Sequence, residues 1–348
     1  MKVIIIGGTG TISEPVVRRL VASGHEVLIF NRGKRAEPPE GARFITGDRR
    51  DPRFAQTMRA HAPYDCVVDM ICFTPDDART DVEVFTGLAP QLVFTSTVDV
   101  YRKDCLTKYL DLPAMETTEF APRAGFAYAL NKVACEQVFR EATGASRQAE
   151  LAVTTIRPAL TYREGSVPFH PLWGGSSQLD RIVKGKPIIL HGDGTSLWTA
   201  LHAEDAAVAY ENAIGNEAAY GKGYTISSDD WMSWEYYWRV VAHVLGNDDP
   251  RFVHIPTDVL VRLAPELANW LPVHFQFHAI FDTSAARRDL GFDPQIRWEE
   301  GAARCVRWIR EHGGFDSSDD HPEYDRIVEA WEGCIARMHE AMGGTDAS

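Results

Sequence analysis

The chain has 348 residues, of which 45% are hydrophobic and 24% charged, so it can bury a large core and has the composition of a soluble globular enzyme. Its formal net charge of −13 at pH 7 argues against sequence-independent binding to nucleic acid or to an anionic membrane, since both need concentrated Lys and Arg. We therefore expect a small-molecule substrate as the partner, with no nucleic acid and no membrane. A small anionic ligand held by a few local arginines is compatible with this charge.

The six cysteines show neither a CxxC pair nor the spacing of a zinc finger, which predicts free, mostly buried thiols. They are Cys66, Cys72, Cys105, Cys135, Cys305 and Cys334. The chain begins MKVIIIGGTG, and its apolar run ends at glycine after six residues. This length indicates a strand rather than a signal peptide or a membrane span, so we expect a cytoplasmic protein.

The first half of the chain alternates predicted strands and helices. The strand of residues 2–6 is followed by a glycine-rich turn and by an amphipathic helix over residues 13–24. Further strands are predicted at 26–30 and within ARFITGD, YDCVVDMI and QLVFTST, and further helices around 52–60 and 76–88. Apolar runs of this kind are buried on both faces. We therefore predict an α/β fold, a Rossmann-type doubly wound parallel sheet that binds its ligand at the carboxyl ends of the strands.

The second half is less regular and predicts a smaller α/β substrate lobe that is interleaved with the first domain. A helix with an aromatic face is predicted in WMSWEYYWRVVAHVLG, and a C-terminal helix from about 322 to 341. The predicted domains are a dinucleotide-binding domain of residues 1–165, to which 188–226 return, a substrate lobe of 166–187 and 227–313, and a polar linker with the C-terminal helix in 314–348.

The stretch IIIGGTGTIS places Gly7, Gly8 and Gly10 between a strand and a helix. A turn without Cβ atoms lets backbone N–H groups and the helix N-terminus approach a pyrophosphate, which predicts a dinucleotide site. Ser13 stands where a third glycine is common in such turns, and a contact between helix and strand tolerates this small replacement.

The end of the second strand, IFNRGKR, offers Asn31 and Arg32 where an NAD site usually has an Asp or Glu for the ribose hydroxyls. A guanidinium binds a 2′-phosphate, and Lys34 and Arg35 lie close by. We therefore predict NADP as the cofactor, with NAD as the alternative. Asp48 in TGDRRD is expected to contact the edge of the adenine ring.

Tyr128 and Lys132 in GFAYALNKVACEQ are four positions apart on a predicted helix and share one face. An ammonium beside a phenol, together with a cationic nicotinamide, is expected to lower the pKa of Tyr128 from about 10 towards neutrality. The phenolate then accepts a hydroxyl proton while the carbon gives hydride to the cofactor, and the reverse step protonates a carbonyl oxygen. In FTSTVDVY, the hydroxyl of Thr97, with Ser96 as its neighbour, is expected to hold that oxygen.

Six stretches in order, GGTGTIS, TGDRRD, FTSTVDVY, YALNK, TTIRPALTY and GDGTSLWTALHAEDAA, resemble the extended short-chain dehydrogenase/reductase superfamily. Within it, the chain is similar to the NAD(P)-dependent epimerase/dehydratase group over roughly residues 1–312. The resemblance implies Thr97, Tyr128 and Lys132 as the catalytic residues. The predicted cofactor residues are Gly7, Thr9, Gly10, Thr11, Ile12, Asn31, Arg32, Asp48, Arg49, Met70, Lys132, Pro158 and Leu160, the last two beside the nicotinamide.

Two departures from the sugar-nucleotide epimerases weaken a nucleotide-sugar assignment. The strand continues RPALTYREG, without the Asn that contacts the diphosphate in those relatives, and Trp198 stands where they carry an Arg that grips it. An aromatic ring suits stacking on a sugar or on another apolar face. The candidate substrate residues are Ser96, Asp99, His170, Trp198 and His274.

Histidines in the second half carry weaker signals. His274 and His278 are four apart, a spacing that can ligate metal from a helix, but no carboxylate lies between them, so no metal site is predicted. His202 and Asp205 in LHAED match a position of the resembled group that anchors loops.

These features predict an NAD(P)-dependent oxidoreductase or epimerase that acts at a secondary alcohol or ketone of a sugar, sugar derivative or nucleotide sugar. They are compatible with an epimerase, a dehydratase, and a dehydrogenase or reductase. One alternative is an NADPH-dependent reductase of a non-sugar natural product, and another is a non-catalytic dinucleotide-binding or RNA-associated protein, since some plastid RNA-binding proteins resemble the same group. Relatives often dimerise through the helix with the Tyr–Lys pair, so the resemblance implies a homodimer.

Overall fold

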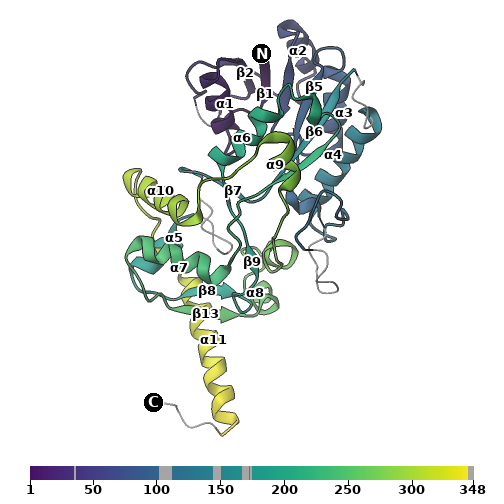
Figure 1. Cartoon of the computed structure of the whole chain (residues 1–348). Helices are drawn as coiled ribbons and strands as arrows, with labels where there is room; N and C mark the ends of the chain where they lie inside the picture. The colour runs from purple at the N-terminus through teal and green to yellow at the C-terminus, as the bar shows by residue number, and fades with distance from the viewer. Residues whose placement is uncertain (35–36, 102–111, 144–149, 167–171, 173–174, 344–348) are drawn as a thin grey trace. The chain divides into compact units, whose positions relative to one another are not determined.

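The computed structural model describes residues 1–34, 37–101, 112–143, 150–166, 172 and 175–343, and Figure 1 shows the chain as a ribbon. The chain divides into two compact units. Unit 1 comprises Met1–Ser166, Thr199–Trp231 and Ala279–Arg297, and unit 2 comprises Val167–Trp198, Met232–His278 and Trp298–Ser348.

Unit 1 is built on a seven-stranded sheet in which all neighbouring strands are parallel. The strands lie in the order β11 (Gly223–Ile226), β6 (Ala152–Pro158), β5 (Gln91–Thr95), β4 (Cys66–Asp69), β1 (Lys2–Ile6), β2 (Glu26–Asn31) and β3 (Arg43–Thr46). The chain forms β1, β2 and β3 first and then crosses to the other side of β1 to form β4. This order confirms the predicted Rossmann-type fold.

Helices cover both faces of this sheet (Figure 1). One face is covered by α1 (Ser13–Ala22), α6 (Ala203–Ala213) and α9 (Ser284–Leu290), and the other by α2 (Phe54–His61), α3 (Pro75–Phe85) and α4 (Ala127–Thr143). Successive residues of a strand point to opposite faces, so Ile5 and Ile29 pack with the first set of helices and Ile4 and Leu28 with the second. An apolar run in the sequence is therefore buried on both sides, and each such side chain contributes about 1.5–3 kcal/mol to folding.

The reversal of strand order beside β1 fixes where a ligand can bind. In open α/β sheets, ligands bind outside the carboxyl ends of the strands at the point where the order reverses, here between β1 and β4. The segments that leave the strands at this edge are residues 7–10, 31–34, 47–50, 70–73 and 96–97. These segments hold half of the site residues that the sequence singles out.

Unit 2 is smaller and contains short sheets and helices. β8 (Ile188–His191) and β13 (Phe252–Ile255) pair in parallel, and β9 (Leu197–Trp198) and β12 (Met232–Ser233) pair antiparallel. The helices are α5 (Ser177–Val183), α7 (Trp234–Leu245), α8 (Thr257–Leu263), α10 (Trp298–Glu311) and α11 (Pro322–Ala341). Leu271–Phe275 form one turn of π-helix.

The aromatic helix expected near residues 231–246 is α7, and local chemistry sets its ends. Ser233 caps the N-terminus by accepting a hydrogen bond from the N–H of Tyr236, and Gly246 ends the helix in the left-handed conformation, with φ of 89°. The helix begins later than predicted because Met232 and Ser233 pair with β9. Its buried face includes Tyr237, whose ring stacks on Trp298 with centroids 4.1 Å apart.

The two units divide the chain differently from the predicted domains, most extensively in residues 188–198 and 279–297. Residues 188–198 belong to unit 2, because β8 pairs with β13 and β9 with β12. Residues 279–297 belong to unit 1, because α9 packs on the face covered by α1 and α6. Each segment is assigned to its unit by contacts with residues far away in the sequence. The order of helices and strands along the chain does not predict such contacts.

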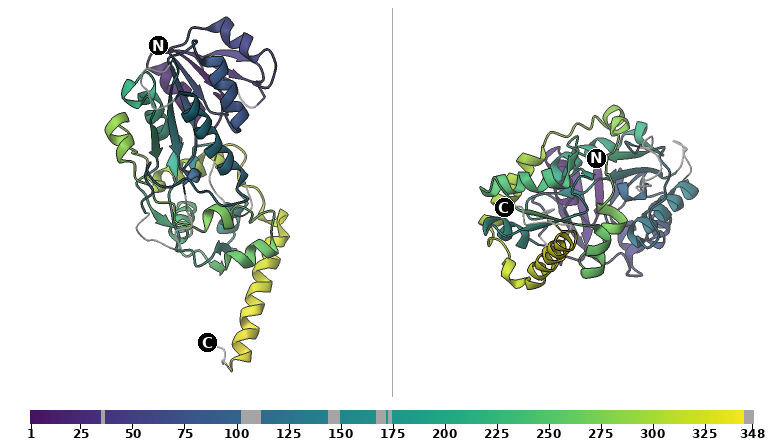
Figure 2. Two further views of the ribbon diagram at one scale, coloured as in Figure 1. Left: turned by 90° about the vertical axis from the view of Figure 1, so that its right-hand side faces the viewer. Right: turned by 90° about the horizontal axis from the view of Figure 1, so that it is seen from below.

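The C-terminal helix α11 lies where the sequence predicts it, and Figure 2 shows it as one continuous helix. Its first part is anchored in unit 2: Tyr324 is buried, its hydroxyl accepts a hydrogen bond from the N–H of Ile189 at 2.6 Å, and Arg181 lies over its ring. Ile335 and Met338 in the second part are exposed.

The remaining short elements are β7 (Thr161–Tyr162), which pairs with β10 (Leu201–His202), and the 3-10 turns η1 (Val98–Val100), η4 (Glu217–Ala219) and η6 (Ser318–Asp320). Of the cysteines in the described ranges, four are buried free thiols and Cys334 is partly exposed, as predicted. Cys105 lies outside the described residues. Among the described helices, none combines the length and apolarity that a membrane span requires.

Candidate functional site

The glycine-rich turn after β1 is shaped so that only glycine fits at its start. Gly7 has φ of 93°, and a Cβ atom there would lie 2.6 Å from Cγ2 of Ile71. A Cβ atom on Gly8 would lie 2.8 Å from Cγ2 of Ile29. The Ser13 hydroxyl closes the turn: its oxygen accepts from the N–H of Gly10 and its proton goes to the carbonyl of Gly7, both at 2.7 Å.

A cavity of about 350 Å³ opens beside this turn and collects most of the predicted cofactor residues. Those that line it are Gly7, Thr9, Gly10, Asn31, Arg32, Asp48 and Arg49. Asn31 bridges two of the turns, because its amide donates to the hydroxyl of Thr9 at 3.0 Å and its carbonyl oxygen accepts from the N–H of Gly33 at 2.7 Å. The rim therefore carries an amide where an NAD site usually carries a carboxylate.

The cavity also has wall residues that the sequence analysis did not assign, namely Arg50, Ile71, Phe73 and Asp77. Ile71 and Phe73 follow a buried strand directly, and this position at a carboxyl end is the signal that could have identified them. Phe73 is 47% exposed, although it is a large apolar residue. Lys34 lines the cavity beside Arg32, whereas Arg35 lies outside the described residues.

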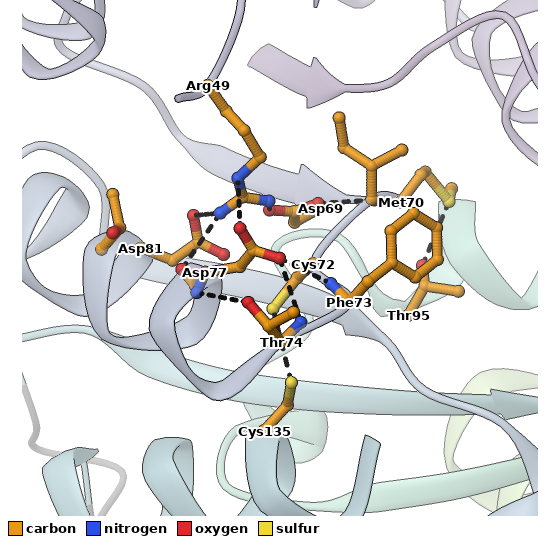
Figure 3. A network of polar contacts seen from close by, with 12 residues as sticks. Arg49, Asp69, Met70, Cys72, Phe73, Thr74, Asp77, Asp81, Thr95 and Cys135 are labelled. Atoms are coloured by element: carbon orange, nitrogen blue, oxygen red, sulfur yellow. Dashed lines mark hydrogen bonds and ion pairs between the residues drawn. The ribbon is translucent and has the colours of Figure 1, made fainter. Parts of the chain in front are cut away.

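Arg49 turns away from solvent into a buried cluster of carboxylates, which Figure 3 shows from close by. Its side chain is 7% exposed, and its guanidinium donates to Asp69 at 2.6 Å and to Asp81 at 2.7 Å. The Asp77 carboxylate lies 3.4 Å from its Nε atom. Arg49 thus belongs to the wall of the cavity, but its charge is occupied by protein carboxylates rather than presented to a ligand.

The same cluster fixes the segment that leaves β4. Asp77 accepts from the N–H groups of Phe73 and Thr74, both at 3.0 Å, and Thr74 caps α3 by accepting from the N–H of Asp77 (Figure 3). Burial raises the pKa of the Asp81 carboxyl well above its usual range, and Asp69 raises it further, while Arg49 lowers it. The cluster therefore holds the backbone of Phe73 and Thr74 in place at the start of α3.

Thr97, Tyr128 and Lys132 come together at the carboxyl end of β5. Tyr128 and Lys132 lie on α4, and the Lys132 Nζ atom is 6.0 Å from the centre of the Tyr128 ring. The Thr97 hydroxyl is in hydrogen-bond contact with Tyr128 and donates to the Asp99 carboxylate at 3.2 Å. Tyr128 is partly exposed and Asp99 is buried.

In the structure, burial and the Asp99 carboxylate act on the pKa of Tyr128 against the lowering expected from Lys132 and a cationic nicotinamide. Burial raises it above the usual value of 10.0, the Asp99 carboxylate raises it further, and the hydrogen bond with Thr97 lowers it. The prediction overlooked the buried setting and the carboxylate of Asp99. In the folded chain Tyr128 is therefore a phenol at neutral pH and is ready to donate a proton.

Lys132 is buried and is held by backbone oxygens. Its ammonium donates to the carbonyl of Cys72 at 2.8 Å and to the carbonyl of Thr95 at 2.7 Å. It also lies over the ring of Phe73, 4.8 Å from the centroid, and Phe73 lines the cavity. Burial lowers the pKa of Lys132, and the carboxylates of Asp69 and Glu136 oppose this. The lysine thus connects the edge of the cavity to the helix that carries Tyr128.

Ser96 does not face the cavity, although the sequence analysis offers it for substrate contact. It is buried, and its hydroxyl donates to the Glu136 carboxylate at 2.6 Å. The substrate candidates Trp198 and His274 lie in unit 2, where they are 1% and 5% exposed and contact each other edge to face at 4.9 Å. This burial favours a packing role for both residues. His170 lies outside the described residues.

The other predicted residues have mostly structural contacts. The Thr11 hydroxyl bonds that of Ser166, Ile12 packs against the core beside α1, and the Met70 sulfur accepts from the Thr95 hydroxyl. Pro158 is buried at the end of β6, and the carbonyl of Leu160 accepts from the N–H of Leu201.

The histidines of the second half have contacts within the protein. The ring of His202 caps α6 by accepting from the N–H of Glu204, and Asp205 accepts from the N–H of Ile296, which are the anchoring roles that the sequence predicts. The Nδ1 atom of His278 accepts from the N–H of Leu197.

Comparisons with known proteins agree with this geometry. Residues 3–227 match the model of the NAD dependent epimerase/dehydratase family. The chain is 29% identical over 248 residues to 2′-dehydrokanamycin reductase of Streptomyces kanamyceticus, covering 71% of this chain and 67% of that protein. It is 25% identical to chloroplast stem-loop binding protein of 41 kDa b of Arabidopsis thaliana (94% and 84% covered) and 26% identical to 2-alkyl-3-oxoalkanoate reductase of Stenotrophomonas maltophilia (87% and 98%).

Solved structures share the fold. The UDP-glucose 4-epimerase of Thermotoga maritima, solved with UDP-glucose, superposes with a TM-score of 0.70 at 18% identity, covering 90% of this chain and 99% of that one. The dTDP-glucose 4,6-dehydratase of Bacillus anthracis, solved with NAD, gives a TM-score of 0.69 at 15% identity, with 90% and 97% covered.

Replacement of the buried guanidinium tests the carboxylate cluster. Arg49→Gln leaves Asp69 and Asp81 without their cation and is expected to lower the free energy of unfolding by about 3–5 kcal/mol. Loss of the cation raises the pKa of the Asp81 carboxyl further above its value in the unfolded chain, so the deficit is expected to be larger at about pH 8 than at about pH 5. Urea unfolding followed by circular dichroism measures both. Arg53→Gln, which removes an exposed ion pair with Asp51, is the control and is expected to change neither. A deficit that grows at low pH would contradict this account.

Proposed function

Because the chain belongs to the NAD dependent epimerase/dehydratase family, we propose that it transfers hydride between NADP(H) and a carbon that carries a secondary alcohol or ketone. The observation that carries the proposal is the meeting of Thr97, Tyr128 and Lys132 at the carboxyl edge of the sheet, joined to the glycine-lined cavity through Phe73. The proposed substrate is a sugar or sugar derivative.

The cavity fits a dinucleotide. Gly7, Thr9 and Gly10 line the cavity at the start of α1, where backbone N–H groups and the helix N-terminus suit a pyrophosphate. Asp48 and Asn31 also line the cavity, and we assign them to the adenosine. When bound, the nicotinamide supplies or accepts the hydride.

The residues of this chain handle the proton at the substrate oxygen. Tyr128 is protonated at neutral pH and donates its proton to a carbonyl oxygen as that oxygen becomes a hydroxyl. The Thr97 hydroxyl lies beside the phenol, and it holds the same oxygen when its proton turns from the Asp99 carboxylate to the substrate. Lys132 keeps a positive charge near the phenol and has a third N–H donor beyond the two that bind the carbonyls of Cys72 and Thr95, and this donor suits a cofactor hydroxyl.

The charges at the cavity rim favour NADP over NAD. Arg32, Lys34 and Arg50 line the side of the cavity next to Asn31. Guanidinium and ammonium groups bind a 2′-phosphate, whereas an Asp or Glu at the position of Asn31 would repel it. An amide at this position removes that repulsion.

A reductase or dehydrogenase is the form of the reaction that we favour. Two of the relatives described above carry the name reductase. Tyr128 is protonated at neutral pH, which is the state that a reduction requires of its proton donor. Enzymes that exchange their cofactor in every turnover use NADP more often than epimerases that retain it. The preference for NADP therefore also favours a reductase or dehydrogenase. A non-sugar ketone is the second substrate class.

RNA binding is the second candidate function, because one relative is named a stem-loop binding protein. The net charge of −13 gives little electrostatic support to such binding, since phosphate contacts need clustered Lys and Arg. The Thr97, Tyr128 and Lys132 arrangement has no use in RNA binding. We therefore rank the enzymatic function first.

The proton donor is tested by Tyr128→Phe. We expect kcat for ketone reduction to fall by about 10²- to 10⁴-fold, because the ring remains and only the hydroxyl is lost. Loss of NADPH absorbance with a panel of ketosugars and non-sugar ketones measures the rate and also identifies the substrate class. Tyr236→Phe, at an exposed tyrosine of unit 2, is the matched control. If the Tyr128 variant turned over at close to the wild-type rate, Tyr128 would not be the proton donor.

Cofactor choice is tested by Arg32→Gln. We expect the Kd for NADP⁺ to rise by about 10- to 100-fold, because a charge-assisted contact with the 2′-phosphate is lost. The Kd for NAD⁺ is expected to stay within about twofold, since NAD⁺ has no group for this contact. Isothermal titration calorimetry measures both, with Arg53→Gln as a control at an exposed arginine. Equal weakening of both cofactors, or tighter binding of NAD⁺ by the wild type, would refute the preference for NADP.

The carboxylate beside Tyr128 predicts a pH effect. Asp99 raises the pKa of Tyr128, so Asp99→Asn is expected to lower that pKa. Reduction needs the protonated phenol, and its rate falls as pH rises through the pKa. The alkaline decline of kcat/KM should therefore move to lower pH in the variant. Asp76→Asn, at an exposed position of α3, should leave the profile unchanged. An alkaline limb that stays in place or moves upward in Asp99→Asn would contradict the role of Asp99.

A further inference from the structure

One face of α4 grips the end of β5 at three successive residues. Tyr128, Lys132 and Glu136 are spaced by four along the helix and therefore form a single stripe. Tyr128 contacts Thr97, Lys132 binds the carbonyl of Thr95, and Glu136 binds the hydroxyl of Ser96. The stripe thus presents a phenol, an ammonium and a carboxylate to consecutive positions of one strand end.

The Glu136 contact is the most buried of the three. Ser96, Glu136 and Arg157 are 1%, 4% and 6% exposed. The Ser96 hydroxyl donates to Oε1 of Glu136 at 2.6 Å, and Arg157 donates from Nε to Oε1 at 2.9 Å and from Nη2 to Oε2 at 2.7 Å. Both carboxylate oxygens are therefore engaged, one of them by Arg157 and by Ser96 together.

Arg157 is itself held from the far side, on β6. Its Nη1 donates to the Tyr101 hydroxyl at 3.2 Å, and that hydroxyl bonds the Thr225 hydroxyl at 2.7 Å. A Cβ atom on Gly223 would lie 2.6 Å from Nη1 of Arg157, so the guanidinium fits only because this position of β11 is glycine. Glu136 therefore meets a cation whose place is set by two strands.

A buried ion pair of this kind is a weak source of stability, because both charges lose their hydration. Its effect is to orient the Glu136 carboxylate towards Arg157. The Ser96 hydroxyl then has a single acceptor in a fixed position. Ser96 is the neighbour of Thr97, so its bond to Glu136 adds a side-chain anchor to a strand end whose backbone is already bonded, with the Ser96 N–H on the carbonyl of Ile156 at 2.7 Å. A displacement of about 1 Å at such a site can cost about 10²-fold in rate.

We propose that Glu136 is a positioning residue for the reaction, and that it acts through Ser96 to keep the Thr97 hydroxyl in contact with the Tyr128 phenol. The inference rests on the proposed function for its consequence in catalysis. The geometric claim, that loss of the Ser96–Glu136 bond releases Thr97 from Tyr128, stands separately and is measurable without a substrate.

The test uses Ser96→Ala in the full-length chain, labelled with 3-fluorotyrosine. This change removes one hydroxyl and leaves the Glu136–Arg157 pair intact. The fluorine resonance of residue 128, assigned by its absence in Tyr128→Phe, is expected to shift by more than its linewidth at neutral pH, because the phenol loses its ordered partner. With a ketone substrate, kcat is expected to fall by about 10- to 100-fold while the Kd for NADP⁺ stays within about twofold.

Thr154→Val is the matched control. Thr154 is also a buried hydroxyl residue of unit 1, with bonds to Gln91 and to the carbonyl of Ala219, so its loss costs stability without touching α4. Its resonance at residue 128 and its kcat should match those of the wild type. Glu136→Gln keeps an acceptor for Ser96 and should leave the resonance nearer to the wild-type position than Ser96→Ala does.

Two results would overturn the positioning role. One is a Ser96→Ala protein whose residue-128 resonance coincides with that of the wild type, and the other is a Thr154→Val protein with the same shift as Ser96→Ala. Failure of the proposed function has a different signature: full turnover in Tyr128→Phe. The two failures are therefore distinguishable.

Discussion

The ammonium group of Lys132 is buried, and a buried charge is stable only where polar atoms replace the water that it has lost. Here those atoms are the carbonyl oxygens of Cys72 and Thr95, which belong to the segments that leave β4 and β5. A single side chain thus ties two neighbouring strand ends to α4. The ring of Phe73 in the cavity wall and the ring of Tyr128 both lie within 6.0 Å of this ammonium group.

Two further buried cations extend the same arrangement along the sheet. Arg49 joins the end of β3 to Asp69 at the end of β4 and to Asp81 on α3. Arg157 joins β6 to Glu136 on α4. The carboxyl edge is therefore held from β3 to β6 by groups whose desolvation is costly unless their partners stay in place. The carbonyls and carboxylates that bind these three cations belong to the protein itself. The edge of the sheet is therefore ordered without a ligand. This preorganisation is what an active site needs, because little rearrangement remains to be made during the reaction.

Local sequence patterns predicted the frame of unit 1 but not the pairing of its buried charges. The apolar runs of β1 and β2, the glycines of the first turn and the four-residue spacing of Tyr128 and Lys132 each act over a few neighbouring residues, and such signals are legible in one sequence. The partners of Arg49 and Ser96 could not be predicted from local patterns, because Asp81 lies 32 positions from Arg49 and Glu136 lies 40 positions from Ser96. Both residues were expected to face a ligand and instead bind protein carboxylates.

The same limit explains the direction of the Tyr128 pKa. A sequence shows that Lys132 shares a face with the phenol, but burial and the approach of Asp99 arise only when the strand end folds against the helix. In unit 2, Trp198 appeared suited to stacking on a substrate because an aromatic residue stands where relatives have an arginine. In the structure its ring stacks on Trp234 and is used in packing.

The hydroxyl of Ser13 has a consequence for the resting protein. A third glycine in the turn would leave the N–H of Gly10 to be satisfied by water or by a ligand, whereas Ser13 supplies an acceptor from within the chain. Departure of a dinucleotide therefore leaves no orphaned donor at Gly10, and the turn is as complete empty as it is occupied. A turn whose Gly10 donor is satisfied from within the chain needs no bound group at that atom, which is compatible with the exchangeable cofactor that we propose.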